Sequence, residues 1–141
     1  METFEFTIKG GDFKSIGYVS NTIKKIMHAR NINPRDSRRI AVAIFEVETN
    51  IILYATQGTI SVLFDNDKIT VLARDEGMGI ADVALAMREG YTTASDDIRR
   101  LGFGAGLGLS NIKKNSDITW ISSIVNKGTQ IVLIFFLTLV L

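Results

Sequence analysis

Cysteine is absent from the 141-residue chain, and proline, histidine and tryptophan each occur once. The lack of cysteine excludes disulfides, thiolate zinc sites and a cysteine nucleophile, and it fits a reducing cytosol. The single histidine, His28, excludes a metal site built from several histidines. Net charge is small as well. The 16 Lys and Arg against 15 Asp and Glu leave +1, without the basic excess that is typical of nucleic-acid-binding proteins.

The chain also lacks a long hydrophobic run. Its most apolar stretch, residues 131–141, is 11 residues long, whereas a helix that crosses a bilayer needs about 20. Because this stretch is rich in Ile, Val and Phe, it is predicted to be a buried final strand. The first ten residues alternate polar and apolar side chains, unlike a signal peptide. We therefore expect a cytoplasmic protein with no membrane segment.

The length predicts one domain over residues 1–141, and the patterning predicts an α+β fold. Alternation indicates a first strand over residues 3–9, and Asp12 is expected to cap the helix that follows. Asn33-Pro34, an N-cap followed by proline at the first helical position, predicts a second helix that ends near residue 55. The remaining expected elements are strands over 59–64 and 68–74, a short helix over 81–88, a loop over 90–104, a helix over 106–114, and strands over 117–125 and 129–138. This order predicts helices on one face of a mixed sheet.

On the second helix, Glu46 and Asn50 are four residues apart and therefore share a face, beside the apolar stripe. Taken alone, the pair is typical of a solvated surface. The functional alternative is a general base and a magnesium ligand that face a cleft. Mg²⁺ takes hard oxygen donors and needs one or two protein ligands when phosphates supply the others.

Residues 75–79, Asp-Glu-Gly-Met-Gly, follow a predicted strand. Asp and Gly are common in turns, so a plain turn is one interpretation. In the other, Asp75 accepts a hydrogen bond from an exocyclic amine, while Gly77 and Gly79 let a ligand approach the backbone.

Glycines alternate along Gly102-Phe-Gly-Ala-Gly-Leu-Gly108, just before a predicted helix. Such a loop can turn backbone N–H groups and a helix N-terminus toward phosphates. A dinucleotide-binding fingerprint would need a preceding strand and a βαβ unit, and a P-loop would end in Gly-Lys-Ser/Thr. Neither pattern is present here.

Together these segments resemble the four boxes of the histidine-kinase-like (GHKL) ATPase superfamily. Glu46-x-x-x-Asn50 resembles its N box, residues 75–80 its first glycine box, residues 102–114 its second, and Lys127-Gly128-Thr129 its final Gly-Thr. The resemblance implies a Bergerat-type two-layer α/β sandwich with a mixed, mainly antiparallel sheet. It also implies ATP and Mg²⁺ as cofactors, with a glycine-rich lid over the ATP.

Within the superfamily, residues 50–58 and 89–100 resemble the small bacterial serine/threonine kinases of partner-switching systems, which include anti-sigma-factor and stressosome switch kinases. That resemblance implies that Glu46 activates the substrate hydroxyl, Asn50 holds magnesium and Asp75 contacts the adenine amine. Phe45 and Glu48 depart from the family pattern. The further nucleotide-binding positions that it implies are Gly77, Gly79, Thr92, Thr93, Gly102, Gly104, Gly106, Leu107, Gly108 and Thr129, with Thr92 and Thr93 at the start of the lid.

Three functions follow from the resemblance. The first is a protein kinase that phosphorylates a small STAS-domain antagonist or stressosome-type protein and so regulates a sigma factor or stress signal. The second is an ATP-bound anti-sigma or activator-binding module, and the third is a detached histidine-kinase catalytic domain. Glu46 favours the first over the second, because a pure binder needs no base, and missing dimerisation helices count against the third. A sigma factor, a phosphatase and a second copy of the chain stay open as partners; nucleic acid and membrane are not expected.

Overall fold

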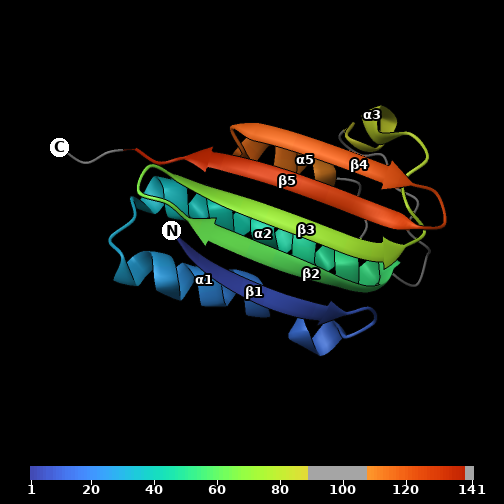
Figure 1. The fold of residues 1–141 in the computed structure, drawn as a ribbon, viewed down its shortest axis with the longest axis horizontal. Coiled ribbons are helices and arrows are strands. Elements are labelled where there is room, and N and C mark those ends of the chain that lie inside the picture. The colour runs from blue at the N-terminus through green and yellow to red at the C-terminus, as the bar shows by residue number, and fades with distance from the viewer. Residues whose placement is uncertain (89–107, 139–141) are drawn as a thin grey trace.

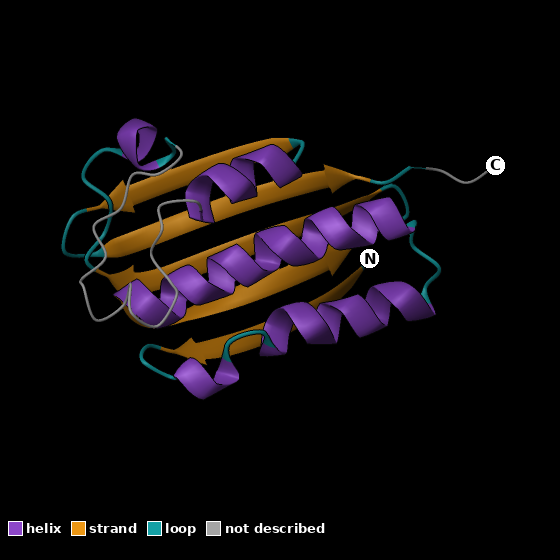
Figure 2. Ribbon diagram, turned by 180° about the vertical axis from the view of Figure 1, so that it is seen from behind, coloured by secondary structure: helices purple, strands orange, loops and turns teal. Residues whose placement is uncertain are grey.

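The protein folds as two layers, a sheet and a layer of helices that covers one face of it (Figures 1 and 2). The structure is a computed structural model, and it describes residues 1–88 and 108–138. The elements in chain order are β1 (Glu2–Lys9), the 3-10 turn η1 (Phe13–Ser15), α1 (Tyr18–Ala29), α2 (Pro34–Tyr54), β2 (Ala55–Phe64), β3 (Lys68–Gly77), α3 (Val83–Ala86), α5 (Gly108–Asn115), β4 (Ile118–Ile124) and β5 (Gly128–Phe136).

The sheet has the order β1-β2-β3-β5-β4, and each neighbouring pair of described strands is antiparallel. The α+β class is thus confirmed, whereas the expectation of a mixed sheet is wrong for the described strands. Short turns account for two of these pairs, β2–β3 and β4–β5, because a tight turn can join only antiparallel neighbours. At the β2–β3 turn, for example, the Asp65 N–H donates to the Lys68 carbonyl at 2.9 Å.

Helix α2 runs along the middle of the helical layer and follows its sequence signals closely. Asn33 accepts the Arg35 N–H through its side chain at 2.8 Å, and Pro34 takes the first helical position, as predicted. At the other end, the Ile52 carbonyl accepts the Gly11 N–H at 2.8 Å. No described helix is long and apolar enough to cross a bilayer. The fully buried stripe of α2 consists of Ile40, Ala43, Ile44, Val47 and Ile51.

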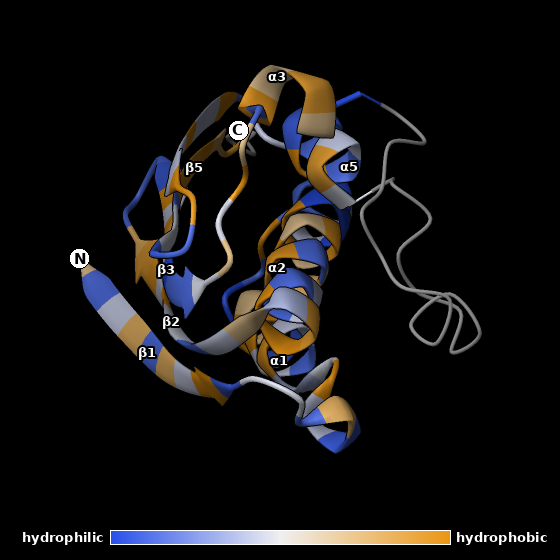
Figure 3. Ribbon diagram, turned by 90° about the vertical axis from the view of Figure 1, so that its right-hand side faces the viewer, coloured by the Kyte–Doolittle hydropathy of each residue, from blue (hydrophilic) through white to orange (hydrophobic). Residues whose placement is uncertain are grey.

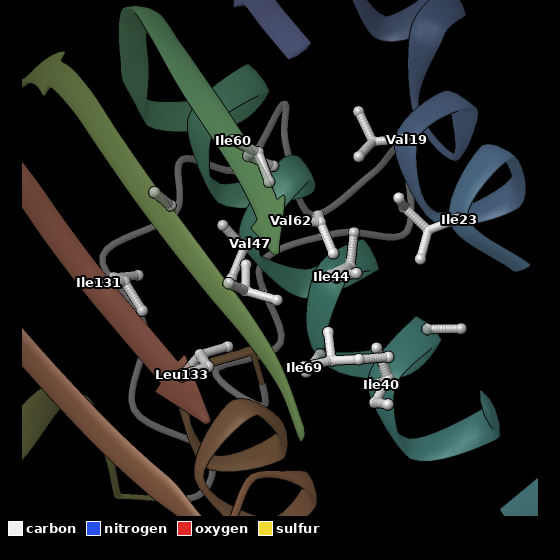
Figure 4. Packing of buried hydrophobic residues seen from close by; sticks show 14 of the residues in the cluster. Val19, Ile23, Ile40, Ile44, Val47, Ile60, Val62, Ile69, Ile131 and Leu133 are labelled. Carbon is white, nitrogen blue, oxygen red and sulfur yellow. The ribbon is translucent and has the colours of Figure 1, made fainter. Parts of the chain in front are cut away.

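The core lies between α2, α1 and the inner face of the sheet. Figure 4 shows Val47 and Ile44 of α2 near Ile60 and Val62 of β2, and Ile40 of α2 beside Ile69 of β3. Burying one such side chain contributes about 1.5–3 kcal/mol. Rotation of α2 about its axis would expose this stripe, so the core fixes the direction in which the remaining side chains of α2 point.

The start of α1 differs from the sequence prediction. Asp12 does not cap α1; its carboxylate accepts the Ser15 hydroxyl at 2.6 Å within η1. Helix α1 begins after Gly17, whose φ of +96° lies in the left-handed region that favours glycine.

The cap of α1 comes instead from Glu48 on α2. Its Oε1 accepts the Gly17 N–H at 3.0 Å and its Oε2 accepts the Val19 N–H at 2.9 Å, and only 1% of Glu48 is exposed. Burial raises the pKa of Glu48, although the backbone N–H groups of Val19 and Gly17 counteract part of that rise. Glu48 thus caps the N-terminus of α1, where backbone N–H groups lack partners within the helix and negative charge is favoured.

Arg39 joins the beginning of α2 to the far ends of β4 and β5. Its guanidinium donates to Asp36 at 3.0 Å, to Asp117 at 3.1 Å and to the Phe136 carbonyl at 2.7 Å. The other oxygen of Asp36 accepts the Thr138 N–H at 2.8 Å. Burial alone would raise the pKa of Asp36, but the Thr138 N–H and the Arg39 guanidinium together hold it below its usual value.

The outer face of the sheet is bare of described helices (Figure 3). Apolar side chains gather on it over β3, β4 and β5. Trp120, on the edge strand β4, is 50% exposed and lies opposite Val132 of β5, which in turn lies opposite Leu72 of β3. Ile118 and Phe136 are exposed on the same face.

Replacing Arg39 by Met should lower the free energy of unfolding at pH 7 by about 3 kcal/mol, because the Asp36 carboxylate would stay buried without its cation. The lowered pKa of Asp36 means that its ionised form stabilises the native state above the pKa it has when unfolded. That contribution is lost as the pH falls through the native pKa. The difference between the two proteins should therefore shrink below about pH 4 in denaturant titrations.

Arg38→Met is the matched control, because Arg38 is exposed on the same helix. An equal loss of stability in both variants would show that the Arg39 ion pairs are not responsible.

Candidate functional site

Glu46 and Asn50 lie on the side of α2 that faces the beginning of α5. A Cβ atom added at Gly108, the first residue of α5, would stand 3.0 Å from Oε2 of Glu46 and 3.4 Å from Oδ1 of Asn50. The backbone of α5 at Gly108 therefore lies so close to both side chains that even a Cβ atom would be in tight contact with Glu46. The two residues share a face, as the spacing predicts, and both are half-buried beside Gly108.

Glu46 is the carboxyl group of this cluster. Burial raises its pKa, and a hydrogen bond from the Asn111 side chain offsets part of the rise. Asn111 lies one turn after Gly108 on α5, so both residues lie on the side of α5 that faces Glu46. The sequence analysis did not single out Asn111. Its position three residues after the last box glycine was the available signal. A carboxylate whose pKa is shifted toward neutrality suits general base chemistry.

A second polar cluster forms a row across three strands on the helix-facing side of the sheet. Asp75 of β3 lies opposite Thr129 of β5, which lies opposite Ser123 of β4. The Thr129 N–H donates to Oδ1 of Asp75 at 3.2 Å, and the hydroxyl oxygens of Thr129 and Ser123 are 2.8 Å apart. Burial raises the pKa of Asp75, and the Thr129 N–H counteracts part of that rise.

Asp75 and Gly77 belong to β3 itself, which corrects the expectation that they follow the strand as a turn. The strand continues because Asp75 keeps ladder partners on both sides, Gly58 of β2 and Thr129 of β5.

Gly77 and Gly79, the glycines of the first glycine box, are explained by packing of the chain on itself. A Cβ atom at Gly77 would stand 2.8 Å from the Tyr54 carbonyl oxygen, and one at Gly79 would stand 2.3 Å from that of Ile124. The expected reason, close approach of a ligand, is therefore not the one that the structure shows. The Asn126 N–H donates to the Met78 carbonyl at 2.8 Å, so residues 77–80 lie against the β4–β5 turn. Contacts of Gly77 and Gly79 with nucleotide stay predictions.

Gly58 brings the two clusters together. A Cβ atom there would stand 2.9 Å from Cγ2 of Ile51 and 3.1 Å from Cβ of Asp75. Ile51 directly follows Asn50 on α2, so the helix side and the sheet side of the site meet at Gly58. The sequence analysis did not name Gly58 as a site residue, although Gly58 ends the stretch 50–58 that carries the resemblance to the small bacterial kinases.

The remaining expected site residues fall outside the part of the chain that the structure describes. They are Thr92, Thr93, Gly102, Gly104, Gly106 and Leu107.

Comparison with known proteins places this site in a family. Residues 35–139 match the family model described as "Histidine kinase-, DNA gyrase B-, and HSP90-like ATPase", and these residues include Glu46, Asn50, Asp75, Gly108 and Thr129. The chain belongs to this ATPase family. The superfamily predicted from the four boxes is thereby confirmed, and membership implies that the protein binds ATP.

Two curated relatives of this ATPase are bacterial regulators. The serine/threonine-protein kinase RsbT of Bacillus subtilis is 34% identical over 100 residues, which are 68% of this chain and 69% of RsbT. An anti-sigma F factor of Caldanaerobacter subterraneus subsp. tengcongensis is 34% identical over 98 residues, 65% of this chain and 64% of that factor. The match thus spans just under two thirds of the second relative.

Solved structures share the fold of the ATPase at low sequence identity. The SiaB-SiaC complex from Pseudomonas aeruginosa contains a chain that matches with a TM-score of 0.65 at 16% identity, over 94% of this chain and 88% of that one. The mycobacterial sensor histidine kinase MprB matches with a TM-score of 0.55 at 15% identity, over 96% of this chain and 97% of that one. The two-layer fold predicted from the resemblance is confirmed.

Replacing Glu46 by Gln should raise the free energy of unfolding at neutral pH. A raised native pKa means that the ionised carboxylate opposes folding above that pKa, and Gln removes this charge while it can still bond to Asn111. The gain should vanish at a pH well below the ordinary carboxyl value, where Glu46 is protonated in both states. Denaturant titrations at neutral and acidic pH measure the difference.

Glu5→Gln, on the exposed side of β1, is the control and should change little. A Glu46→Gln protein that is less stable than the native protein at pH 7 would contradict this account of the Glu46 carboxyl.

Proposed function

We propose that this ATPase is a serine/threonine protein kinase of a bacterial partner-switching system. It binds and phosphorylates a small STAS-type antagonist in the cytoplasm and thereby regulates a sigma factor or a stress signal. The observation that carries the proposal is the half-buried Glu46 carboxyl, which Asn111 holds beside Asn50 and the start of α5. The similarity to RsbT, which is a serine/threonine-protein kinase by name, supports it.

The chemistry of the acceptor explains why Glu46 matters. A serine or threonine hydroxyl must lose a proton as its oxygen attacks the γ-phosphorus, and a positioned carboxylate can take that proton. A histidine acceptor attacks with a free lone pair and has no such need. A protein that only binds its partner has no need of a base either. The raised pKa and the hydrogen-bonded orientation of Glu46 thus favour hydroxyl phosphorylation.

Asn50 is the residue that would hold magnesium. Among the residues that the structure describes, no group of three or more His, Cys, Asp and Glu could bind a metal ion by itself. One amide oxygen fits Mg²⁺ when phosphate oxygens and waters complete the octahedron. When bound, ATP would supply the phosphoryl group and magnesium would neutralise its charge, and Asn50, on the same face of α2 as Glu46, is the residue that would hold the ion.

Asp75 would select the adenine base. One of its oxygens accepts the Thr129 N–H, and the other, which has no hydrogen-bond partner among the described residues, could accept the exocyclic amine. The remaining residues assigned to the nucleotide are Gly77, Gly79, Thr92, Thr93, Gly102, Gly104, Gly106, Leu107, Gly108 and Thr129.

A second candidate function is an ATP-bound anti-sigma or activator-binding module without significant kinase activity. The relatives named anti-sigma F factor favour it. These names refer to a sigma factor and do not mention phosphorylation. The two candidates differ in whether the carboxyl of Glu46 is needed for turnover.

Replacing Asp75 by Asn should weaken ATP binding by about 1.5–3 kcal/mol, the contribution of a hydrogen bond to a charged group. Titration calorimetry with magnesium ATP measures this. Asp67→Asn, in the exposed β2–β3 turn, is the matched control and should bind like the native protein. Unchanged ATP affinity in Asp75→Asn would remove Asp75 from the site.

Replacing Glu46 by Gln should lower the rate of phosphoryl transfer about 10²–10⁴-fold, because the variant keeps the shape of the side chain and loses its basicity. Affinity for ATP should hardly change. The assay incubates the native and variant proteins with labelled ATP, magnesium and STAS-domain proteins encoded beside the gene, and follows label on Ser or Thr.

Two further variants are needed to interpret the result for Glu46→Gln. Asn50→Ala should damage magnesium-dependent binding as well as turnover, whereas Glu5→Gln should change neither. If Glu46→Gln transfers phosphate at the native rate, Glu46 is not the base and the binding module becomes the better proposal. Label on histidine or aspartate would contradict a serine/threonine kinase.

A further inference from the structure

The hydroxyl of Ser123 joins three parts of the protein that carry the predicted adenine site. Its Oγ accepts the Ile80 N–H at 2.7 Å, and it lies 2.8 Å from the Thr129 hydroxyl and 3.1 Å from the Gly128 carbonyl oxygen. Ile80 ends the first glycine box, while Gly128 and Thr129 form the last one. Ser123 belongs to neither box.

The register of the sheet places Ser123 at the end of the row that begins at Asp75. Asp75, Thr129 and Ser123 are successive cross-strand partners on β3, β5 and β4. Side chains of such partners lie on the same face of a sheet, here the face toward the helices. Asp75 accepts the backbone N–H of Thr129. The hydroxyl of Thr129 is a separate group, which contacts Ser123 and can also contact a ligand.

The protons of this row can be counted. A serine hydroxyl has one proton and two lone pairs. One lone pair accepts the Ile80 N–H, and the proton can go either to Gly128 or to Thr129. If Ser123 donates to Thr129, the Thr129 proton is free to serve as a donor. If Ser123 donates to Gly128, Thr129 donates back to Ser123 and offers a ligand only lone pairs.

The two arrangements suit different bases. The edge of adenine presents the 6-amino donor beside the N1 acceptor, whereas guanine presents the O6 acceptor beside the N1–H donor. An ionised Asp75 can only accept hydrogen bonds, and among the described residues only one of its oxygens, Oδ1, has a hydrogen-bond partner, the Thr129 N–H. An acceptor at Asp75 beside a donor at Thr129 complements adenine and opposes guanine.

We infer that Ser123 is a positioning residue for base selection. Its proton can go to the Gly128 carbonyl oxygen at 3.1 Å or, over the shorter distance of 2.8 Å, to the Thr129 hydroxyl. In the second arrangement Thr129 becomes a donor beside Asp75, which favours adenine over guanine. This inference rests on the proposed nucleotide site. It assigns to Ser123 a specificity role that acts through Thr129 and requires no contact of Ser123 with the nucleotide.

A purely structural role for Ser123 has a different consequence. If the hydroxyl only fastens residues 77–80 to β4, its loss loosens the site for every nucleotide, and ATP and GTP lose affinity by the same factor. The inferred role predicts unequal losses, because a Thr129 hydroxyl without Ser123 can turn either its proton or its lone pairs toward the base.

The test measures the affinities of magnesium ATP and magnesium GTP by calorimetry for the native full chain and for Ser123→Ala. The ATP/GTP preference should fall about three- to tenfold, the equivalent of one hydrogen bond, mainly through weaker ATP binding. Ser123→Thr keeps the hydroxyl and should keep the preference. Ser122→Ala makes the same chemical change on the exposed side of the strand and should have no effect.

Amide hydrogen exchange at Ile80 in the nucleotide-free proteins provides a second readout. Exchange should accelerate in Ser123→Ala and not in Ser122→Ala, because only the first variant removes the acceptor of that N–H. If Ser123→Ala does not fold, Ser123→Cys replaces it, since a thiol keeps the volume and is a weak donor.

The outcomes separate this inference from the function on which it rests. Native protein that prefers ATP, with a preference that Ser123→Ala leaves intact, overturns the role of Ser123 and leaves the nucleotide site standing. Equal losses for both nucleotides, or unchanged exchange at Ile80, overturn it too. Native protein that binds no ATP overturns the proposed function and the inference together.

Discussion

Because Ile40, Ile44, Val47 and Ile51 are fully buried, α2 has only one rotational setting on the sheet, and the direction of Glu46 and Asn50 follows from it. The helix is held at both ends as well. Arg39 fastens its first turns to the ends of β4 and β5, and the Gly11 N–H donates to the Ile52 carbonyl near its end. The hydrophobic core therefore determines where Glu46 and Asn50 lie. Helix α5 then packs beside these two residues on α2.

Among the described residues, Asp36, Glu46, Glu48 and Asp75 are carboxyl groups whose pKa is shifted and affected by burial, and their partners divide them into two kinds. Asp36 and Glu48 use both oxygens on protein donors and hold elements together. Asp75 uses one oxygen on the Thr129 N–H among the described residues, and the pKa of Glu46 is raised by burial despite Asn111. A buried acceptor with unused capacity is costly to the native state, and such groups gather where a ligand can supply the missing partner.

Local signals in the sequence predicted what is locally determined. The Asn33 cap, the apolar stripe of α2 and the order of the boxes were all readable, because each depends on neighbours within a few residues. The start of α1 was not, since its cap is Glu48, which is 29 and 31 residues away from the amides that it accepts. Glu48 therefore stood out in the sequence as a departure from the family pattern and turned out to be structural. Asn111 and Ser123 were missed for the same reason, because their partners come from other elements.

The single tryptophan of the chain has a consequence of its own. Trp120 lies half-exposed on the outer face of β4, whereas Ser123 on the same strand belongs to the row that faces the helices. The indole is thus separated from the row of Asp75, Thr129 and Ser123 by the thickness of the sheet. Its fluorescence emission will respond to whatever covers Leu72, Ile118 and Phe136 around it, since exclusion of water shifts indole emission. Filling of the opposite face by nucleotide will leave that emission almost unchanged, so the protein carries an optical reporter for association on its open side.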